Sequence, residues 1–157
     1  PPGAHVAVGV GFLRRQAELL IARAPPPPHR GVRRPTVVSA FTASAYKDVL
    51  AFASLWRAVE SDLSAFAPGQ LVLLAFHPNR VDSGPGCLPH MADDAGHFSV
   101  RAPLPTLQLL RDVDVDTARA QWAHTHGGPG ALGLLTANKR TLRSIGADAL
   151  HAMLFSH

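Results

Sequence analysis

The residue best placed to do chemistry is His77, which directly follows an apolar run from Leu71 to Phe76. Such a run predicts a buried strand, and α/β folds bind ligands where strands end. Arg101, further along the chain, carries a guanidinium that can hold an anion. Together they suggest an anion site with His77 as acid or base. In the structural alternative, His77 hydrogen-bonds the loop backbone and Pro78 fixes the turn.

Side chains of metal-ligand type lie between these two positions: Cys87, His90, Asp93, Asp94 and His97. A structural zinc site needs four ligands with a second Cys or His pair at a defined spacing, and that pair is missing. We therefore expect an ordinary polar loop, no metal site and no cofactor. Because the chain has one cysteine, it cannot form an internal disulfide, which is typical of a reducing compartment.

The remaining polar groups fit structural roles. His124 and His126 do not share a helix face, and we expect them at a helix end where positive charge is favourable. Three aspartates flank the start of a helix, where carboxylates are stabilised: Asp112, Asp114 and Asp116. The sequence has no G-x-S-x-G, Walker, G-x-G-x-x-G or H-E-x-x-H motif. We therefore assign no catalytic residue.

The spacing of apolar residues predicts the helices that must position these groups. Steps of three and four residues predict helices over 9–23, 46–66, 115–123 and 131–155. We expect Thr42 or Ser44 to cap the second helix and Asp114 to cap the third. Gly146 is expected to kink or divide the last helix.

Three stretches have the composition of strands: 36–41, 70–76 and a segment from Leu104. The stretch 70–76 is apolar throughout, so we expect both of its faces to be covered. A helix from Thr106 is the alternative for the third stretch. Residues 77–98 lack periodicity and predict a long surface loop.

This order of elements favours an α+β fold: a small, mainly antiparallel sheet of three to four strands with helices packed on one face, a ferredoxin-like arrangement being one candidate. The 157 residues, 46% of them hydrophobic, suit one core. We place an N-terminal helix and Pro-rich basic arm at residues 1–30 and a single α+β domain at 31–157. No apolar stretch is long enough to form a transmembrane segment.

Four stretches together resemble the uncharacterised family called domain of unknown function 1415. They are F-H-P at 76–78, D-D at 93–94, R-A-P-L-P-T-L-Q-L-L-R at 101–111 and N-K-R-T-L-R-S-I-G at 138–146. The family pattern is F-H-P-x-Y, a D-D loop, N-R-S-P-Y-P-x-L-H-L-L-R-E and N-x-x-T-L-x-x-L-G. The resemblance spans roughly residues 10–147 and implies a shared fold more than a reaction.

The departures from this pattern remove polar groups. The family's N-terminal G-L-N-x-C-P-F cysteine segment has no counterpart here, and the tyrosine after F-H-P is missing. At four positions the family's Asn, Ser, Tyr and His become Val100, Ala102, Leu104 and Gln108. His77 and Arg101 persist as ligand-binding candidates. We therefore expect a pseudoenzyme-like scaffold whose polar site has been refilled mostly with apolar side chains.

These features favour a non-catalytic accessory subunit of a large organellar protein complex that acts through protein–protein contacts. The candidate compartment is the mitochondrion, and the respiratory chain is the candidate complex. The arginine-rich, acid-poor first residues resemble the neighbourhood of a removed transit peptide. Because aromatic side chains dominate interface energetics, the interface candidates are Phe12, Trp56, Trp122 and Phe155. The alternative for each is core packing.

Two other functions stay open. One is a small-molecule or anion-binding enzyme that uses His77 and Arg101. The other is an RNA-binding ribosomal accessory protein, or contact with anionic lipid, through Arg30, Arg33 and Arg34. The chain has thirteen arginines, two lysines and a net charge of +4, which coding bias also explains. Aromatic side chains for base stacking are few and scattered, which weakens the RNA hypothesis.

Overall fold

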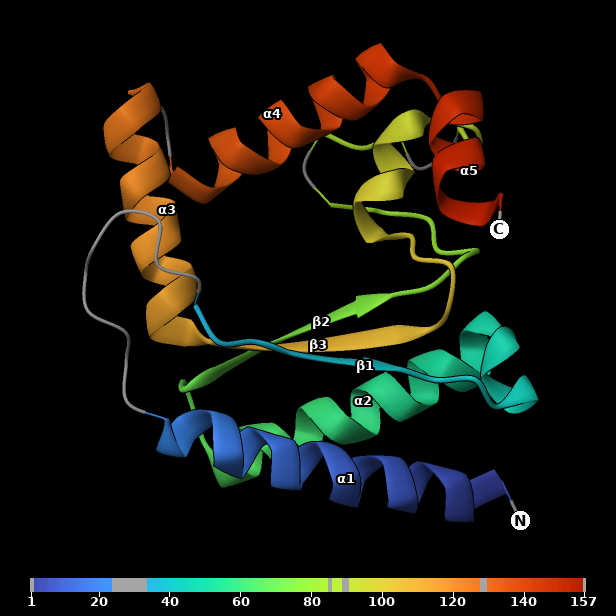
Figure 1. The fold of residues 1–157 in the computed structure, drawn as a ribbon, viewed down its shortest axis with the longest axis vertical. Coiled ribbons are helices and arrows are strands. Elements are labelled where there is room, and N and C mark those ends of the chain that lie inside the picture. The colour runs from blue at the N-terminus through green and yellow to red at the C-terminus, as the bar shows by residue number, and fades with distance from the viewer. Residues whose placement is uncertain (1, 24–33, 85, 89–90, 128–129, 157) are drawn as a thin grey trace. The chain divides into compact units, whose positions relative to one another are not determined.

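The computed structural model describes residues 2–23, 34–84, 86–88, 91–127 and 130–156. Its contacts divide the chain into two compact units, whose residues can be located in Figure 1 with the colour bar. Unit 1 comprises Pro1–Ala75 and Thr106–Asp116, and unit 2 comprises Phe76–Pro105 and Thr117–His157. The boundary expected at residue 30 and the prolines before it lie outside the described residues.

Unit 1 is built on a three-stranded sheet with the order β1-β3-β2, formed by β1 (Val37–Ala40), β2 (Leu71–Phe76) and β3 (Thr106–Arg111). The central strand β3 runs antiparallel to its neighbours, with Val37 opposite Leu109. Since β1 and β2 flank β3, they form with the helix between them a split β-α-β unit, which ferredoxin-like folds also contain. The predicted α+β class with an antiparallel sheet is confirmed.

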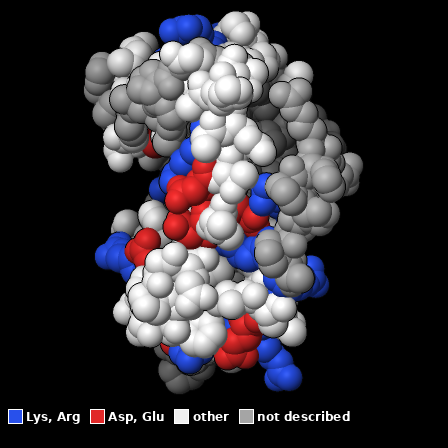
Figure 2. Space-filling model, turned by 90° about the vertical axis from the view of Figure 1, so that its left-hand side faces the viewer, with Lys and Arg blue, Asp and Glu red and all other residues white. Residues whose placement is uncertain are grey.

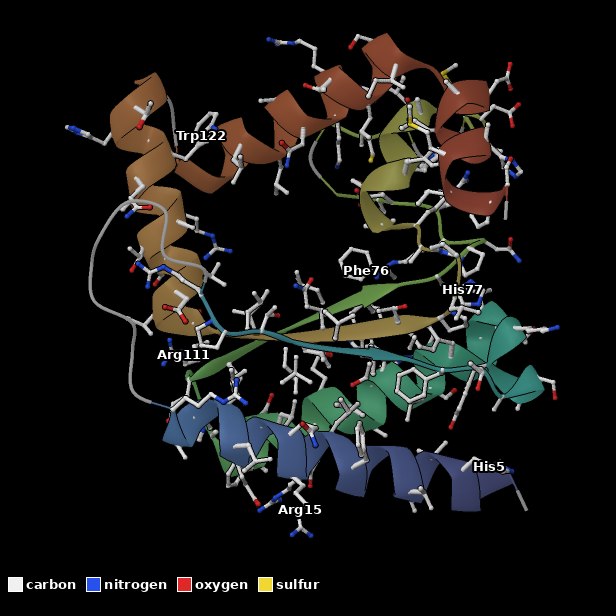
Figure 3. The ribbon with its side chains drawn as sticks, viewed as in Figure 1. His5, Arg15, Phe76, His77, Arg111 and Trp122 are labelled. Atoms are coloured by element: carbon white, nitrogen blue, oxygen red, sulfur yellow. The ribbon has the colours of Figure 1, made fainter. Side chains whose placement is uncertain are left out.

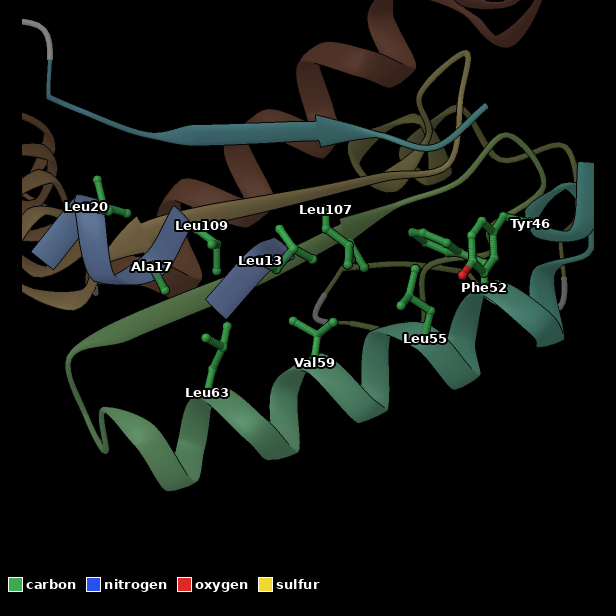
Figure 4. Close-up of a cluster of buried hydrophobic side chains, with 11 residues drawn as sticks. Leu13, Ala17, Leu20, Tyr46, Phe52, Leu55, Val59, Leu63, Leu107 and Leu109 are labelled. Atoms are coloured by element: carbon green, nitrogen blue, oxygen red, sulfur yellow. The ribbon is translucent and has the colours of Figure 1, made fainter. Parts of the chain in front are cut away.

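Helices α1 (Pro2–Ala22) and α2 (Val49–Phe66) pack on one face of this sheet. Alternation along β3 turns Leu107 and Leu109 toward that face, and both are fully buried. Figure 4 shows the helix side chains that meet them. The buried members from the two helices are Leu13, Ala17, Leu20, Phe52, Leu55, Val59 and Leu63.

The start of α2 differs from the prediction. Residues Ser44–Lys47 form a short 3₁₀ turn, η1, so the α-helix begins later than expected. Its N-cap is Asp48, whose Oδ1 accepts the main-chain N–H groups of Leu50 and Ala51 at 2.9 and 2.8 Å. The predicted caps Thr42 and Ser44 were therefore wrong, because the turn separates them from the first helical N–H groups.

Two expectations about the strands were also wrong. β2 is an edge strand, and Leu74 remains 39% exposed, so its two faces are not both covered. The third strand begins at Thr106, after Pro105, and leaves Leu104 43% exposed. The ladder between β3 and β1 excludes the alternative helix from Thr106.

Unit 2 contains the 3₁₀ turn η2 (Ala95–Val100), most of α3 (Asp112–His126), α4 (Gly130–Ile145) and α5 (Ala147–Phe155). The expected long loop thus ends in ordered structure. Gly146 has φ of +90°, a value that favours glycine, and it divides the predicted last helix as expected. A small core joins η2 to α4 and α5: Ala95, Phe98 and Leu150, with Leu142, Ala147, Leu154 and Phe155 packed against them.

Asp114 does not cap α3. The helix begins at Asp112, directly after β3, so Asp114 lies inside the first turn. Within the described residues, no helix is both long and apolar enough to cross a bilayer.

Candidate functional site

The candidate site of unit 2 is a groove of about 460 Å³, lined by Pro78, Asn79, Arg101, His151 and Phe155. Three chain segments that are distant in sequence contribute to it: the turn after β2, the residue that follows η2, and α5. A groove of this size fits a small molecule. It contains one of the two predicted ligand-binding residues, Arg101.

His77 does not line this groove. Its side chain is 1% exposed and lies just past the end of β2 (Figure 3). Its Nδ1 accepts the main-chain N–H of Asn79 at 3.1 Å, and its own main-chain N–H donates to the carbonyl of Val100 at 3.1 Å. These contacts match the structural alternative, in which the histidine holds the loop backbone.

Arg101 is held by neutral groups. Its Nε donates to the carbonyl of Arg80 at 3.2 Å, and Nη2 donates to the carbonyl of Ala92 at 3.4 Å. The guanidinium carbon lies 4.9 Å from the centre of the Phe98 ring. These contacts fix the side chain and leave its positive charge without a carboxylate partner among the described residues.

A second polar cluster surrounds Asp82. Its carboxylate accepts hydrogen bonds from Lys139 Nζ at 2.9 Å, Ser99 Oγ at 2.9 Å and the main-chain N–H of Gly84 at 2.8 Å. Burial alone would raise the pKa of Asp82, but these hydrogen bonds outweigh it and hold the pKa well below its usual range. The cluster therefore carries a stable carboxylate beside a buried ammonium.

Cys87 belongs to the same cluster and interacts with Asp82 and Lys139. Burial raises the pKa of the Cys87 thiol, which favours the weakly nucleophilic protonated form. His97 is fully buried, and its Nδ1 accepts the main-chain N–H of Asp82 at 3.1 Å. Its Nε2 therefore carries the proton and donates to the carbonyl of Met91 at 2.9 Å.

The acidic pair 93–94 contributes a third contact. Arg143 donates from Nε and Nη2 to the two carboxylate oxygens of Asp94, at 2.8 and 2.6 Å. This hydrogen bonding holds the pKa of Asp94 well below its usual range. Asp94 also accepts the N–H of Gly96, at 3.0 Å. Two of the stretches that resemble the family pattern thus meet in one ion pair.

Three of the side chains of metal-ligand type, Cys87, Asp94 and His97, have these separate partners instead of a common centre. Where the structure describes the chain, no three His, Cys, Asp or Glu side chains come together as ligands of one ion would. His90 lies outside the described residues.

The basic candidates for RNA or lipid contact are only partly described. Arg30 and Arg33 lie outside the described residues. Arg34 donates to Asp114 Oδ1 at 2.5 Å, while Arg111 donates to the other oxygen at 2.7 Å. Burial would raise the pKa of Asp114, but the two arginines hold it below its usual value. Figure 2 shows acidic and basic side chains mixed on the face that it draws.

The four aromatic interface candidates differ in exposure. Phe12 is 51% exposed on α1. Trp56 is half-buried against the core of unit 1, and Trp122 is half-buried on α3. Phe155 packs on the small core of unit 2 and lines the groove. Phe12 is therefore the interface candidate in unit 1 whose side chain is most exposed.

Three of the four residues in the two ion pairs of unit 2 were not singled out from the sequence: Asp82, Lys139 and Arg143. A signal for Lys139 was available: it stands four residues after Leu135 and three before Leu142, on the apolar side of a predicted helix. A lysine at such a position is buried only when it is paired, which pointed to an acidic partner.

Comparison with known proteins agrees with the motifs. No curated protein and no solved structure gives a significant match to the chain. A family model, described as protein of unknown function (DUF1415), matches residues 33–152. This range includes the whole groove apart from Phe155, the buried His77 and both ion pairs of unit 2. The chain belongs to the DUF1415 family.

Proposed function

We propose that this protein is a non-catalytic accessory subunit of a large mitochondrial assembly, and that it binds a neighbouring subunit through α1. The observation that carries the proposal is an exposed apolar stripe on that helix. Val8, Phe12 and Leu19 are 73%, 51% and 54% exposed, whereas Leu13 and Ala17 are fully buried. α1 therefore presents apolar side chains in two directions, and the core of unit 1 uses one of them.

The exposed side chains have the spacing of a helix–helix seam. Val8, Phe12, Arg15 and Leu19 are separated by four, three and four residues, which places them along one side of the helix. Figure 3 shows Arg15 pointing away from the sheet. We infer that the partner supplies an amphipathic helix, with an acidic side chain opposite Arg15.

A groove of about 370 Å³ adjoins this stripe. Val8 and Phe12 form part of its wall together with Phe41 and Tyr46, whose rings pack edge to face with centres 5.5 Å apart. Grooves of this kind seat the large apolar anchors that carry most of the binding energy at protein interfaces. One such side chain of the partner helix would fill it.

The mitochondrial location rests on the sequence. Residues 1–34 contain six arginines and a single acidic residue, Glu18, a composition typical of the neighbourhood of organellar targeting segments. The loss of polar groups from the family pattern supports a role through contacts instead of catalysis. Leu104, for example, is exposed where that pattern has tyrosine.

The test is to express the tagged full chain in cells, isolate their mitochondria and analyse a native extract by size-exclusion chromatography. We expect the chain to elute with a large complex, and cross-linking to join α1 to a helix of one subunit. The double variant Val8→Ser/Phe12→Ser should elute as the free chain. The matched control Leu50→Ser removes an equally exposed apolar side chain, 70% exposed, from α2 and should stay in the complex. Elution of the unaltered chain alone, or its absence from mitochondria, would refute the proposal.

A further inference from the structure

We propose that unit 2 also binds a small organic anion in the groove lined by Arg101 and His151. This site is independent of the contact proposed for α1, since its residues belong to the other unit. Its volume, about 460 Å³, falls within the range of small-molecule pockets. The anion would be a carboxylate or phosphate attached to a short apolar or aromatic body.

Arg101 supplies the charge that such a ligand needs. Its Nε and Nη2 donate to the carbonyls of Arg80 and Ala92, and its guanidinium lies over the Phe98 ring. Carbonyl oxygens and an aromatic face fix a guanidinium without neutralising it. Its Nη1 has no hydrogen-bond partner in the described part of the chain, so it remains available to a ligand. A prepositioned guanidinium forms strong charge-assisted hydrogen bonds with carboxylate or phosphate oxygens.

Two further polar side chains share the groove. His151 lies exposed on α5, with its ring 4.8 Å from that of Phe155, and Asn79 lies exposed on the turn after β2. The imidazole and the amide can each donate a hydrogen bond to an oxygen of the anion. Pro78 and Phe155 add apolar walls, which is why we infer an organic anion and not a bare ion.

The buried His77 acts here as a positioning residue. Its Nδ1 accepts the N–H of Asn79, so it fixes the turn that carries one side of the groove. Its main-chain N–H donates to the carbonyl of Val100, the residue before Arg101. This bond connects the turn that carries Asn79 to the segment that carries Arg101. The F-H-P stretch and the arginine therefore serve one site, although they are more than twenty residues apart.

The experiment is an NMR titration of the isotope-labelled full chain with phenyl phosphate, benzoate and inorganic phosphate. We expect saturable shifts of the amide signals of Asn79, His151 and Phe155 with the two organic anions. Shifts with inorganic phosphate at similar affinity would show that the charge alone is recognised, and would overturn the inferred organic body. The phosphate and carboxylate probes together identify which head group the site prefers.

Variants separate binding from folding. Arg101→Met should weaken binding by roughly tenfold to a hundredfold, the effect of losing a charge-assisted hydrogen bond. Because Arg101 also holds main-chain carbonyls, His151→Ala provides a second variant on an exposed helix position and should weaken binding more modestly. The matched control Arg140→Met removes an exposed arginine of α4 outside the groove and should bind normally. If millimolar concentrations of all three probes leave the groove signals unchanged, or if Arg140→Met has the same effect as Arg101→Met, the site does not exist.

Discussion

The Nζ of Lys139 lies 2.9 Å from Oδ2 of Asp82, and the lysine side chain is only 2% exposed. An ammonium that is removed from water loses several kcal/mol of hydration free energy, which only a well-bonded carboxylate can offset. Asp82 meets this requirement, because Ser99 and Gly84 bond it as well. The pair therefore fixes α4 against the chain that follows β2.

We predict that Lys139→Met destabilises unit 2 by roughly 3–5 kcal/mol, the usual effect of removing one partner of a buried ion pair. The free energy of unfolding would be measured by urea denaturation. Trp122 emission in a Trp56→Phe background reports on unit 2, since the two tryptophans lie in different units. The exposed neighbour Arg140 gives the control: Arg140→Met should change stability by no more than about 0.5 kcal/mol. A loss below about 1 kcal/mol for Lys139→Met would contradict the role of the pair.

The contrast between Lys139 and α2 shows what the sequence could and could not predict. Helix α2 could be predicted from its apolar spacing, because the spacing of apolar side chains along a helix shows which face is buried. The partner of a buried charge cannot be predicted in this way, because it depends on a contact between distant parts of the chain. Asp82 and Lys139 are 57 residues apart, and nothing in local periodicity tells which acid a lysine will meet. Burial of Lys139 was therefore predictable, and its partner was not.

The groove illustrates the same limit. Arg101 was predicted as an anion-binding residue from its side chain and its motif. His151 was not, because it lies 50 residues further on and α5 brings it to the groove. His77 was predicted for its position after a strand, but whether a side chain at a strand end points into a pocket or under the loop depends on the turn. Here the N–H of Asn79 holds the imidazole beneath the turn.

We predict that unit 2 loses stability in acid. The Asp94 carboxyl has a lower pKa in the folded chain than in the unfolded chain, because Arg143 bonds both of its oxygens. The unfolded chain therefore binds more protons at low pH. The stabilising contribution is complete above the unfolded pKa of about 4 and is lost as pH falls further toward the folded pKa. The contribution of Asp94 to the stability of unit 2 should therefore be constant from neutral pH to about 5 and fall below it.

The variant Asp94→Asn tests this assignment. It should lower stability at neutral pH and reduce the slope of unfolding free energy against pH in the acid range. Urea denaturation at a series of pH values measures both quantities. Asp93→Asn is the control, because Asp93 is the exposed neighbour of the same type. An equally steep acid slope in Asp94→Asn would assign the pH dependence to other carboxyls.

In unit 1, substitution of Asp114 should lower stability as much as substitution of Lys139 does in unit 2. The carboxylate is 4% exposed and bonds both Arg34 and Arg111, the second of which is itself buried. Replacing it by asparagine leaves the Arg111 guanidinium without its carboxylate, so Asp114→Asn should cost roughly 3–5 kcal/mol. Thermal or urea unfolding followed by Trp56 emission in a Trp122→Phe background measures the change. Asp116→Asn is the control, because Asp116 is an exposed acid two residues further along α3. Equal effects of the two variants would argue against the role of the contacts between Asp114 and the two arginines.

Two glycines of α1 offer a matched test of how closely the helices pack. A Cβ built at Gly9 would lie 2.9 Å from Cδ1 of Leu55 on α2, whereas a Cβ at Gly11 has nothing within 4 Å. Gly11→Leu should stabilise unit 1 by about 0.5–1 kcal/mol, because glycine is a poor helix former. Gly9→Leu has the same helix propensity, but it overpacks the contact with Leu55 and should cost about 1–3 kcal/mol. Urea unfolding followed by Trp56 emission, again in the Trp122→Phe background, compares the two variants. A stabilising Gly9→Leu would mean that α1 and α2 lie further apart in solution than this contact requires.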